Sequence, residues 1–243
     1  MKGYCCICFF RKIKDRKNFD HFLFAEILEN KNIKKISSDV LIIKEKLLKE
    51  DGKKFLNEIF NLKREKNFLI AIEGTENYYL NKQLLELKRS NIAIVDIFFP
   101  YFNKKDDLHY AYSGINHVLL NIMKRNNIAI GIELEKILKA IEKNDFIYLS
   151  KIIQNANWAR KKKVNFCLFI NAKNNSKIPD ALDLFNFLLA IGFDTKQAKN
   201  CLIYPKIKLD LNKEIFKHKF GEVYIYNIDE EIKLIDYLKA IEA

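Results

Sequence analysis

The sequence is poor in the residues that build tight turns. Its 243 residues include only seven Gly and three Pro, fewer than the many short connections of a β-sandwich require. It also lacks any apolar stretch close to the ~20 residues that a membrane-spanning helix needs. The short apolar run at 4–10 has no A-x-A-like cleavage pattern after it. We therefore expect a first strand there and not a signal peptide.

Cysteine and histidine occur without the spacing that metal sites need. The sequence Cys-Cys-Ile-Cys near the start lacks the two-residue spacer of a zinc knuckle, and the four His form no H-x-H or H-E-x-x-H pattern. An odd number of Cys without disulfide-like spacing predicts a reducing, cytoplasmic environment. We therefore expect buried thiols at Cys5, Cys6, Cys8, Cys167 and Cys201.

Positive charge and apolar residues are abundant. The formal net charge is +12 and 49% of the residues are hydrophobic. The apolar share is sufficient for a sizeable core. The basic excess suggests a polyanionic partner, with nucleic acid ranked before a membrane surface. A requirement for solubility, together with the lysine-rich habit of an AT-rich genome, would produce the same composition.

Short apolar runs alternate with segments of helical spacing along the chain. Strands are predicted at 4–10, 38–43, 68–72, 92–99, 128–134, 164–171 and 222–226. Helices are predicted at 19–29, 47–62, 80–88, 113–124, 135–142, 146–161, 179–190, 195–202 and 229–242. Ser113 is expected to cap the start of its helix, and Gly192 to end another.

The apolar runs mostly do not alternate with polar residues, as expected for strands of a parallel sheet that helices cover on both faces. Six or seven βα repeats favour an α/β fold in a single domain, a TIM-like (β/α) barrel that is regular, distorted or incomplete. A doubly wound sheet is the alternative, but no Gly-rich phosphate loop follows the first strand. We expect the barrel over 1–211 and a C-terminal strand–helix extension packed on it over 212–243.

Several carboxylates are predicted at strand ends, where barrel enzymes place their active sites. With a nearby His they could bind a divalent metal or transfer protons, which is the basis of a metal-dependent phosphoesterase hypothesis using Glu73, Asp96, Glu133 and His117. Against it, the His spacing fits no metal motif, and a lone His on the apolar side of a helix is more often a hydrogen-bonded core residue. The full set of polar candidates is Glu73, Asp96, Asn116, His117, Glu133, Glu135 and Asn171.

Basic residues gather at two predicted helix ends and after two predicted strands. Lys and Arg at a helix C-terminus also compensate the helix dipole, so each cluster alone is weak evidence. Together they indicate contacts to RNA phosphates, and the absence of RNP-type aromatic motifs favours recognition by shape. The candidates are Arg11, Lys12, Lys14, Arg16, Lys17, Lys124, Arg125, Arg160, Lys161, Lys162, Lys163, Lys173 and Lys177.

The central segment SGINHVLLNIMKRNNIAIGIEL resembles the archaeal ribonuclease P protein component 3 family, which has a counterpart in eukaryotes. That family has a V-D-I strand, a G-x-[ND]-H-V-L-A helix start and a V-A-I-E-[IL] strand, which match 95–97, 114–119 and 130–134 here. Leu120 replaces the Ala of the helix and Gly131 the Ala of the strand.

A second part of the resemblance lies further along, and the whole covers about 92–211. The family's basic-x-P-x-D helix start is similar to 177–180, where the Asp follows Pro directly, and its L-G helix end is similar to 191–193. The turn at 171–173 lacks the family's serine, and Lys177 replaces its Arg. The motif residues that the resemblance marks are Asp96, Gly114, Asn116, His117, Glu133, Pro179 and Asp180.

The resemblance implies a TIM-like barrel that serves as a non-catalytic subunit of ribonuclease P, the ribonucleoprotein that matures the 5′ end of precursor tRNA. The family's RNA component cleaves with Mg²⁺, and no cofactor is bound by the barrel itself. Implied partners are the ribonuclease P RNA, component 2, the other protein subunits and precursor tRNA, with no membrane. The family's barrel resembles that of the polymerase-and-histidinol-phosphatase phosphoesterases. A metal-dependent phosphoesterase of this type is the alternative function. A pure interaction scaffold is a third hypothesis. If the chain is a ribonuclease P subunit, we expect Asp96, Asn116 and His117 to support the barrel architecture and the docking of partners.

Overall fold

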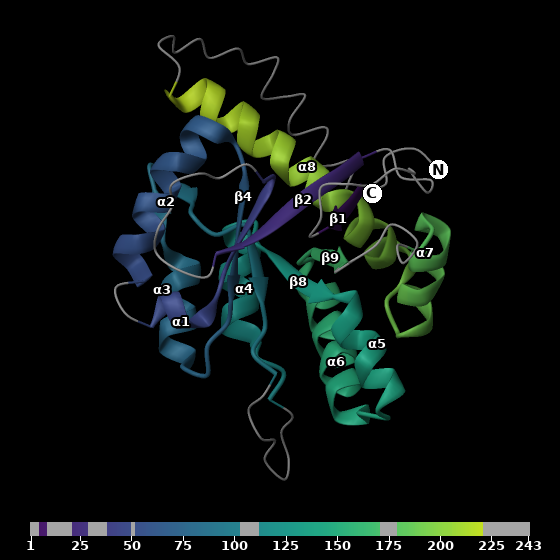
Figure 1. The fold of residues 1–243 in the computed structure, drawn as a ribbon. Coiled ribbons are helices and arrows are strands. Elements are labelled where there is room, and N and C mark those ends of the chain that lie inside the picture. The colour runs from purple at the N-terminus through teal and green to yellow at the C-terminus, as the bar shows by residue number, and fades with distance from the viewer. Residues whose placement is uncertain are drawn as a thin grey trace.

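Seven parallel strands form a closed barrel (Figure 1). The computed structural model describes residues 5–8, 21–28, 38–49, 52–102, 112–170 and 179–220. The barrel closes where β1 pairs with β9, with Ile7 opposite Phe169, and it has one strand fewer than the eight of a regular TIM barrel. The strands in barrel order are β1 (Cys5–Cys8), β2 (His21–Leu28), β3 (Val40–Ile43), β4 (Leu69–Glu73), β7 (Ile97–Phe99), β8 (Ala129–Glu133) and β9 (Phe166–Ile170).

Helices surround the barrel, and the predicted α/β class is confirmed. Figure 1 shows α8 lying obliquely across one end of it. None of the described helices is both long and apolar enough to cross a membrane. The helices are α1 (Glu45–Leu48), α2 (Gly52–Lys66), α3 (Tyr78–Glu86), α4 (His117–Arg125), α5 (Leu134–Glu142), α6 (Phe146–Lys162), α7 (Ala181–Ala190) and α8 (Thr195–Phe220).

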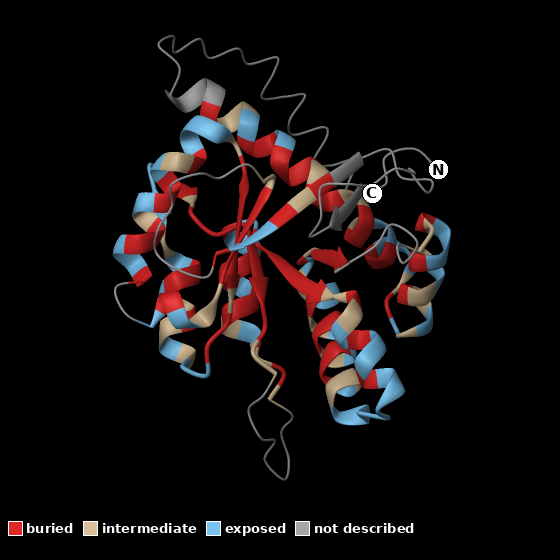
Figure 2. Cartoon of the chain, in the orientation of Figure 1, coloured by how far each residue is buried: buried red, intermediate tan, exposed pale blue. Residues whose placement is uncertain are grey.

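Alternating strand residues build two separate cores. Alternate residues along a strand point into the barrel, and the residues between them pack beneath the helices. Figure 2 shows most of β3, β4, β7, β8 and β9 as buried, whereas part of β2 is exposed. The interior is narrow. It combines Ala71, Ala129 and Gly131 with two large rings, Phe99 and Phe169, whose centroids are 4.8 Å apart. The phenyl ring of Phe99 occupies the space above Gly131, since a Cβ there would lie 2.7 Å from it.

The helix predicted at 19–29 is wrong, because this segment contains β2. Its apolar residues fit helical spacing, but periodicity does not distinguish a short apolar helix from a buried strand. In β2, Leu23 and Ala25 point into the barrel while Glu26 is exposed. Pairing with β1 on one side and β3 on the other then satisfies its backbone.

The single strand predicted at 92–99 is also wrong. Its first part is β6 (Ile92–Ala93), which forms an antiparallel hairpin with β5 (Lys88–Arg89). Ser90 and Asn91 both adopt positive φ, +50° and +61°, as the two-residue turn of a hairpin requires. The barrel strand β7 starts only at Ile97, so Asp96 lies at its beginning.

Two helix boundaries also differ from the prediction. The helix predicted at 47–62 is divided into α1 and α2. The helix predicted at 195–202 continues to Phe220 with Pro205 inside it, and therefore crosses the predicted domain boundary at Leu211. The strand and helix predicted at 222–226 and 229–242 lie outside the described residues. Cys167 and Cys201 are buried and form no disulfide among the described residues, in agreement with the prediction of buried thiols.

Candidate nucleic-acid interface

Helix α8 covers the N-terminal mouth of the barrel, where the strands begin. Polar residues immediately before four strands hydrogen-bond to it, so the strand starts form a ring of attachment points. The pairs are Asn67 Nδ2 to the Leu209 carbonyl at 3.4 Å, Asn212 Nδ2 to Asp96 Oδ1 at 2.9 Å, the Tyr204 hydroxyl to Asn127 Oδ1 at 2.7 Å, and Asn200 Nδ2 to Asn165 Oδ1 at 3.3 Å.

Asp96 is the most heavily bonded of these attachment points. Its Oδ2 accepts from Lys63 Nζ of α2 at 2.5 Å and from the Ile70 backbone N–H at 2.8 Å. Lys208 Nζ of α8 lies 3.6 Å from Oδ1. Lys63, Asp96 and Lys208 are 0%, 1% and 6% exposed. Two amines thus share one carboxylate in a space closed to solvent.

Burial and charge act in opposite directions on these groups. Burial lowers the pKa of Lys63 and of Lys208, and the attraction of Asp96 only partly compensates. Burial alone would raise the pKa of Asp96, but the two amines and the bonds from Lys63 and Asn212 outweigh it and hold the pKa below its usual value. Asp96 is therefore an ionised anchor that joins α2, β7 and α8.

The structure does not bring the predicted metal-binding set together. Glu73 and Glu133 end β4 and β8 at the C-terminal mouth, whereas Asp96 starts β7 at the opposite mouth. The expectation that these three carboxylates line one face is wrong, because β7 starts later than predicted. Glu73 pairs with Lys44 at 2.5 Å. Among the described residues, no three His, Cys, Asp or Glu side chains are grouped to hold a metal ion.

The remaining polar candidates lie in ion pairs, at the start of a helix or outside the described residues. Glu133 and Glu135 form ion pairs along α5, with Lys136 at 2.6 Å and Lys139 at 3.1 Å. His117 was expected on the apolar side of its helix, but it is the exposed first residue of α4. Asn171 lies outside the described residues.

The motif residues Gly114 and Asn116 shape the start of α4. Gly114 has φ +73°, and a Cβ there would lie 2.6 Å from the Tyr101 nitrogen. Asn116 is the N-cap of α4, accepting from Val118 N at 3.1 Å and Leu119 N at 3.0 Å, so the cap predicted at Ser113 is wrong. Both residues line a small pocket of about 180 Å³ at the C-terminal mouth. Pro179 and Asp180 directly precede α7, and Asp180 takes its N-cap position.

The predicted basic helix ends lie at the N-terminal mouth, beside α8. The end of α4 hydrogen-bonds into the start of β8, from Ile128 N to the Met123 carbonyl, and the end of α6 does the same before β9, from Val164 N to the Ala159 carbonyl. This places two predicted basic clusters at the same end of the barrel: Lys124 with Arg125, and Arg160 with Lys161, Lys162 and Lys163.

These basic side chains differ in whether they already pair with an acidic group of the protein. Arg160 holds the α7–α8 turn, through Asp194 at 2.7 Å and the Gly192 carbonyl at 3.3 Å. Arg125 lies 3.8 Å from Glu86, and both side chains are well exposed. In the part of the chain that the structure describes, Lys124, Lys161, Lys162 and Lys163 have no acidic partner. Arg11, Lys12, Lys14, Arg16, Lys17, Lys173 and Lys177 lie outside the described residues.

Sequence reasoning missed Lys63, Lys208 and Asn212. Lys63 follows Ile59 and Phe60 at helical spacing and so occupies the buried face of α2. That position was a usable signal, since a lysine in an apolar stripe indicates a buried partner. Lys208 and Asn212 had no comparable signal, because both lie beyond a Pro in a segment whose apolar spacing is irregular.

No protein-family model matches the sequence. The structure is similar to a chain in the cryo-EM structure of archaeal ribonuclease P with mature tRNA, with a TM-score of 0.66 and 20% sequence identity. The match covers 92% of this chain and 98% of that chain. At this identity the similarity establishes that the two chains share a fold over almost their entire lengths.

Proposed function

We propose that this protein is a non-catalytic subunit of ribonuclease P, which supports RNA-catalysed removal of the 5′ leader from precursor tRNA. The observation on which the proposal depends is the end-to-end fold match with a chain of an archaeal ribonuclease P, 92% of one chain against 98% of the other. The resemblance of 92–211 to the component 3 family is independent support, since it was found in sequence motifs and not in the fold.

The chemistry of the described surface agrees with a supporting role. Three of the polar residues that first suggested catalysis have structural roles: Asp96 anchors α8, Glu73 pairs with Lys44 and Asn116 caps α4. Lysines that have no acidic partner among the described residues gather at the N-terminal mouth instead. Lysine contacts to phosphates position a protein on RNA without cleaving it. Cleavage would then come from the RNA component with Mg²⁺.

The proposed partners follow from the same assignment. The chain binds the ribonuclease P RNA, together with component 2 and the other protein subunits, and precursor tRNA is the substrate of the whole particle. The basic N-terminal mouth is the surface proposed to face RNA. The phosphoesterase alternative, with Glu73, Asp96, Glu133 and His117, has no observation in its favour, since Asp96 lies at the opposite mouth from both glutamates.

Reconstitution tests the proposal. Precursor tRNA would be incubated with the cognate ribonuclease P RNA and component 2, with and without this chain, across a Mg²⁺ series. We expect the complete mixture to release the 5′ leader faster and at lower Mg²⁺, with the cut mapped to the mature 5′ end. The chain alone should not cleave. An unchanged rate and Mg²⁺ requirement, or metal-dependent hydrolysis by the isolated chain, would contradict the proposal.

A further inference from the structure

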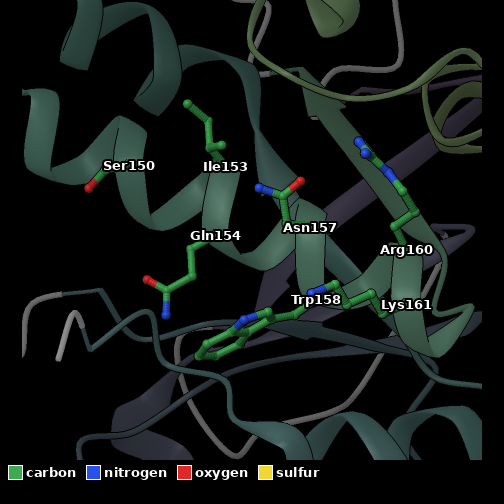
Figure 3. A pocket seen from close by; sticks show the side chains of 7 residues that line it. All are labelled: Ser150, Ile153, Gln154, Asn157, Trp158, Arg160 and Lys161. Atoms are coloured by element: carbon green, nitrogen blue, oxygen red, sulfur yellow. The ribbon is translucent and has the colours of Figure 1, made fainter.

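Helix α6 has an open depression of about 590 Å³ along its outer face, lined by residues of this helix (Figure 3). The depression is more open than enclosed, and all of its lining residues come from this one helix. Gln154, Trp158 and Lys161 lie at spacings of four and three residues, so they share one side of the helix. Figure 3 shows these three side chains extending to the same side, while Asn157 lines the depression nearby.

Trp158 is the only Trp in the chain. Its indole is half-buried and packs against the main hydrophobic core, and it also lines the depression. A half-buried ring that packs on the core and also lines the depression is held in a fixed orientation. Flat aromatic surfaces of this kind stack nucleobases of any identity, because every base has a π-face.

Positive charge continues directly from this ring. Lys161 and Lys163 are exposed, Lys162 is half-buried, and within the described residues none of them has an acidic partner. Lys163 lies just beyond the helix in a left-handed conformation, with φ +56°. Dipole compensation accounts for basic residues in the last turn, but it does not account for an aromatic ring beside them that lines a depression. A stacking surface next to phosphate-binding cations is the combination that proteins use for single-stranded nucleic acid.

We propose that the depression on α6 holds an unpaired nucleotide of an RNA strand. This inference rests on the proposed function and specifies one point of RNA contact. The base stacks on the Trp158 indole, and the flanking phosphates contact Lys161 and Lys162. The exposed amide of Asn157 can donate to or accept from a base edge. A free nucleotide offers the same base and phosphate chemistry, so the test must separate the two sources.

The single Trp provides a direct readout. Purified full-length protein would be titrated with a single-stranded oligoadenylate, the same strand annealed to its complement, and adenosine monophosphate, while the Trp158 emission is followed. We expect saturable quenching by the single strand alone. Saturable quenching by the mononucleotide at equal concentration would overturn an RNA strand as the occupant, and equal quenching by the duplex would overturn recognition of an unpaired base.

Variants complete the test. Trp158→Leu should weaken binding of a labelled single strand about tenfold, the loss that ~1.4 kcal/mol of stacking corresponds to. The matched control is Phe146→Leu, which removes a ring that is 71% exposed at the other end of the same helix and should leave affinity unchanged. RNA binding without quenching, together with normal affinity in Trp158→Leu, would overturn this inference while leaving the proposed function intact. Absence of any RNA binding would overturn both.

Discussion

At the residue scale, Asp96 shows how a side chain that resembles a catalytic group can serve the fold. A carboxylate beside an apolar strand suggests an active site, yet here it is fully buried between two lysines. Removing one partner of such a buried group leaves an uncompensated charge, which costs far more than the loss of an exposed ion pair. The same geometry that excludes Asp96 from solvent makes it indispensable for joining α8 to the barrel.

We expect Asp96→Asn to lower the free energy of unfolding by about 3–5 kcal/mol, because it leaves Lys63 and Lys208 buried without a counter-charge. Urea denaturation at pH 7 measures this. The control Glu135→Gln removes the exposed pair with Lys139 and should cost less than about 1 kcal/mol. Lys208→Met, which leaves one amine for one carboxylate, should cost less than Asp96→Asn. A loss below 1 kcal/mol for Asp96→Asn would refute the anchoring role.

The same variant should change the acid dependence of stability. The folded pKa of Asp96 is lowered, so its ionised form stabilises the fold fully above the unfolded pKa, about 3.9. That contribution is lost as pH falls through the lowered folded pKa. The stability difference between the natural chain and Asp96→Asn should therefore be constant above about pH 5 and shrink below pH 4. The measurement is urea denaturation over a pH series.

At the element scale, sequence pattern predicted most strands but missed β2 and the start of β7. Apolar runs at 68–72, 128–134 and 164–171 are buried on both faces, and the structure confirms them as β4, β8 and β9. The failures have physical causes. The apolar residues of β2 fit two periodicities equally well. The apolar run at 92–99 is interrupted at 94–96, between β6 and β7, where no Gly or Pro marks the break.

Helix α8 is the clearest case of an element that pattern could not predict. Its contacts to the barrel include two polar residues, Lys208 and Asn212, whose burial depends on Asp96, far away in the sequence. Pro205 also interrupts the backbone hydrogen bonding within it. The helix persists because Tyr204 and Leu209 pack into the barrel interior. Contacts with the barrel therefore stabilise a helix that its own sequence pattern does not predict. For this reason the polar residues at the N-terminal mouth could be predicted only in part.

Helix α4 offers a test of a local boundary. Asn116→Ala removes the side chain that accepts from Val118 N and Leu119 N, and we expect a loss of about 1 kcal/mol in unfolding free energy. Asn116→Ser should retain most of the stability, because Ser caps well. Chemical denaturation of both variants checks this. If Asn116→Ala were as stable as the natural chain, the cap assigned here would be incorrect.

At the scale of the whole molecule, the two mouths of the barrel have different roles. Barrel enzymes place their chemistry at the C-terminal mouth, where this chain has Glu73 and Glu133, each paired with a lysine. The N-terminal mouth is closed by α8, and the ends of α4 and α6 add lysines without described acidic partners around it. Part of the basic excess behind the net charge of +12 therefore lies at the N-terminal mouth, the end of the barrel where enzymes of this fold do not place their active sites.

That asymmetry predicts which lysines determine the salt dependence of RNA binding. Each phosphate contact contributes about −0.7 to −0.9 to the slope of log K against log salt. Replacing Lys161, Lys162 and Lys163 with Gln should therefore make the slope for a tRNA transcript less steep by about 2–3. The matched control replaces Lys136, Lys139 and Lys143 with Gln, which removes the same charge from α5 and its C-cap, and this helix begins at the C-terminal mouth. Lys136 and Lys139 already pair with Glu133 and Glu135, so that slope should barely change. Equal changes in the two triple variants would mean that RNA responds to total charge and that the N-terminal mouth has no special role.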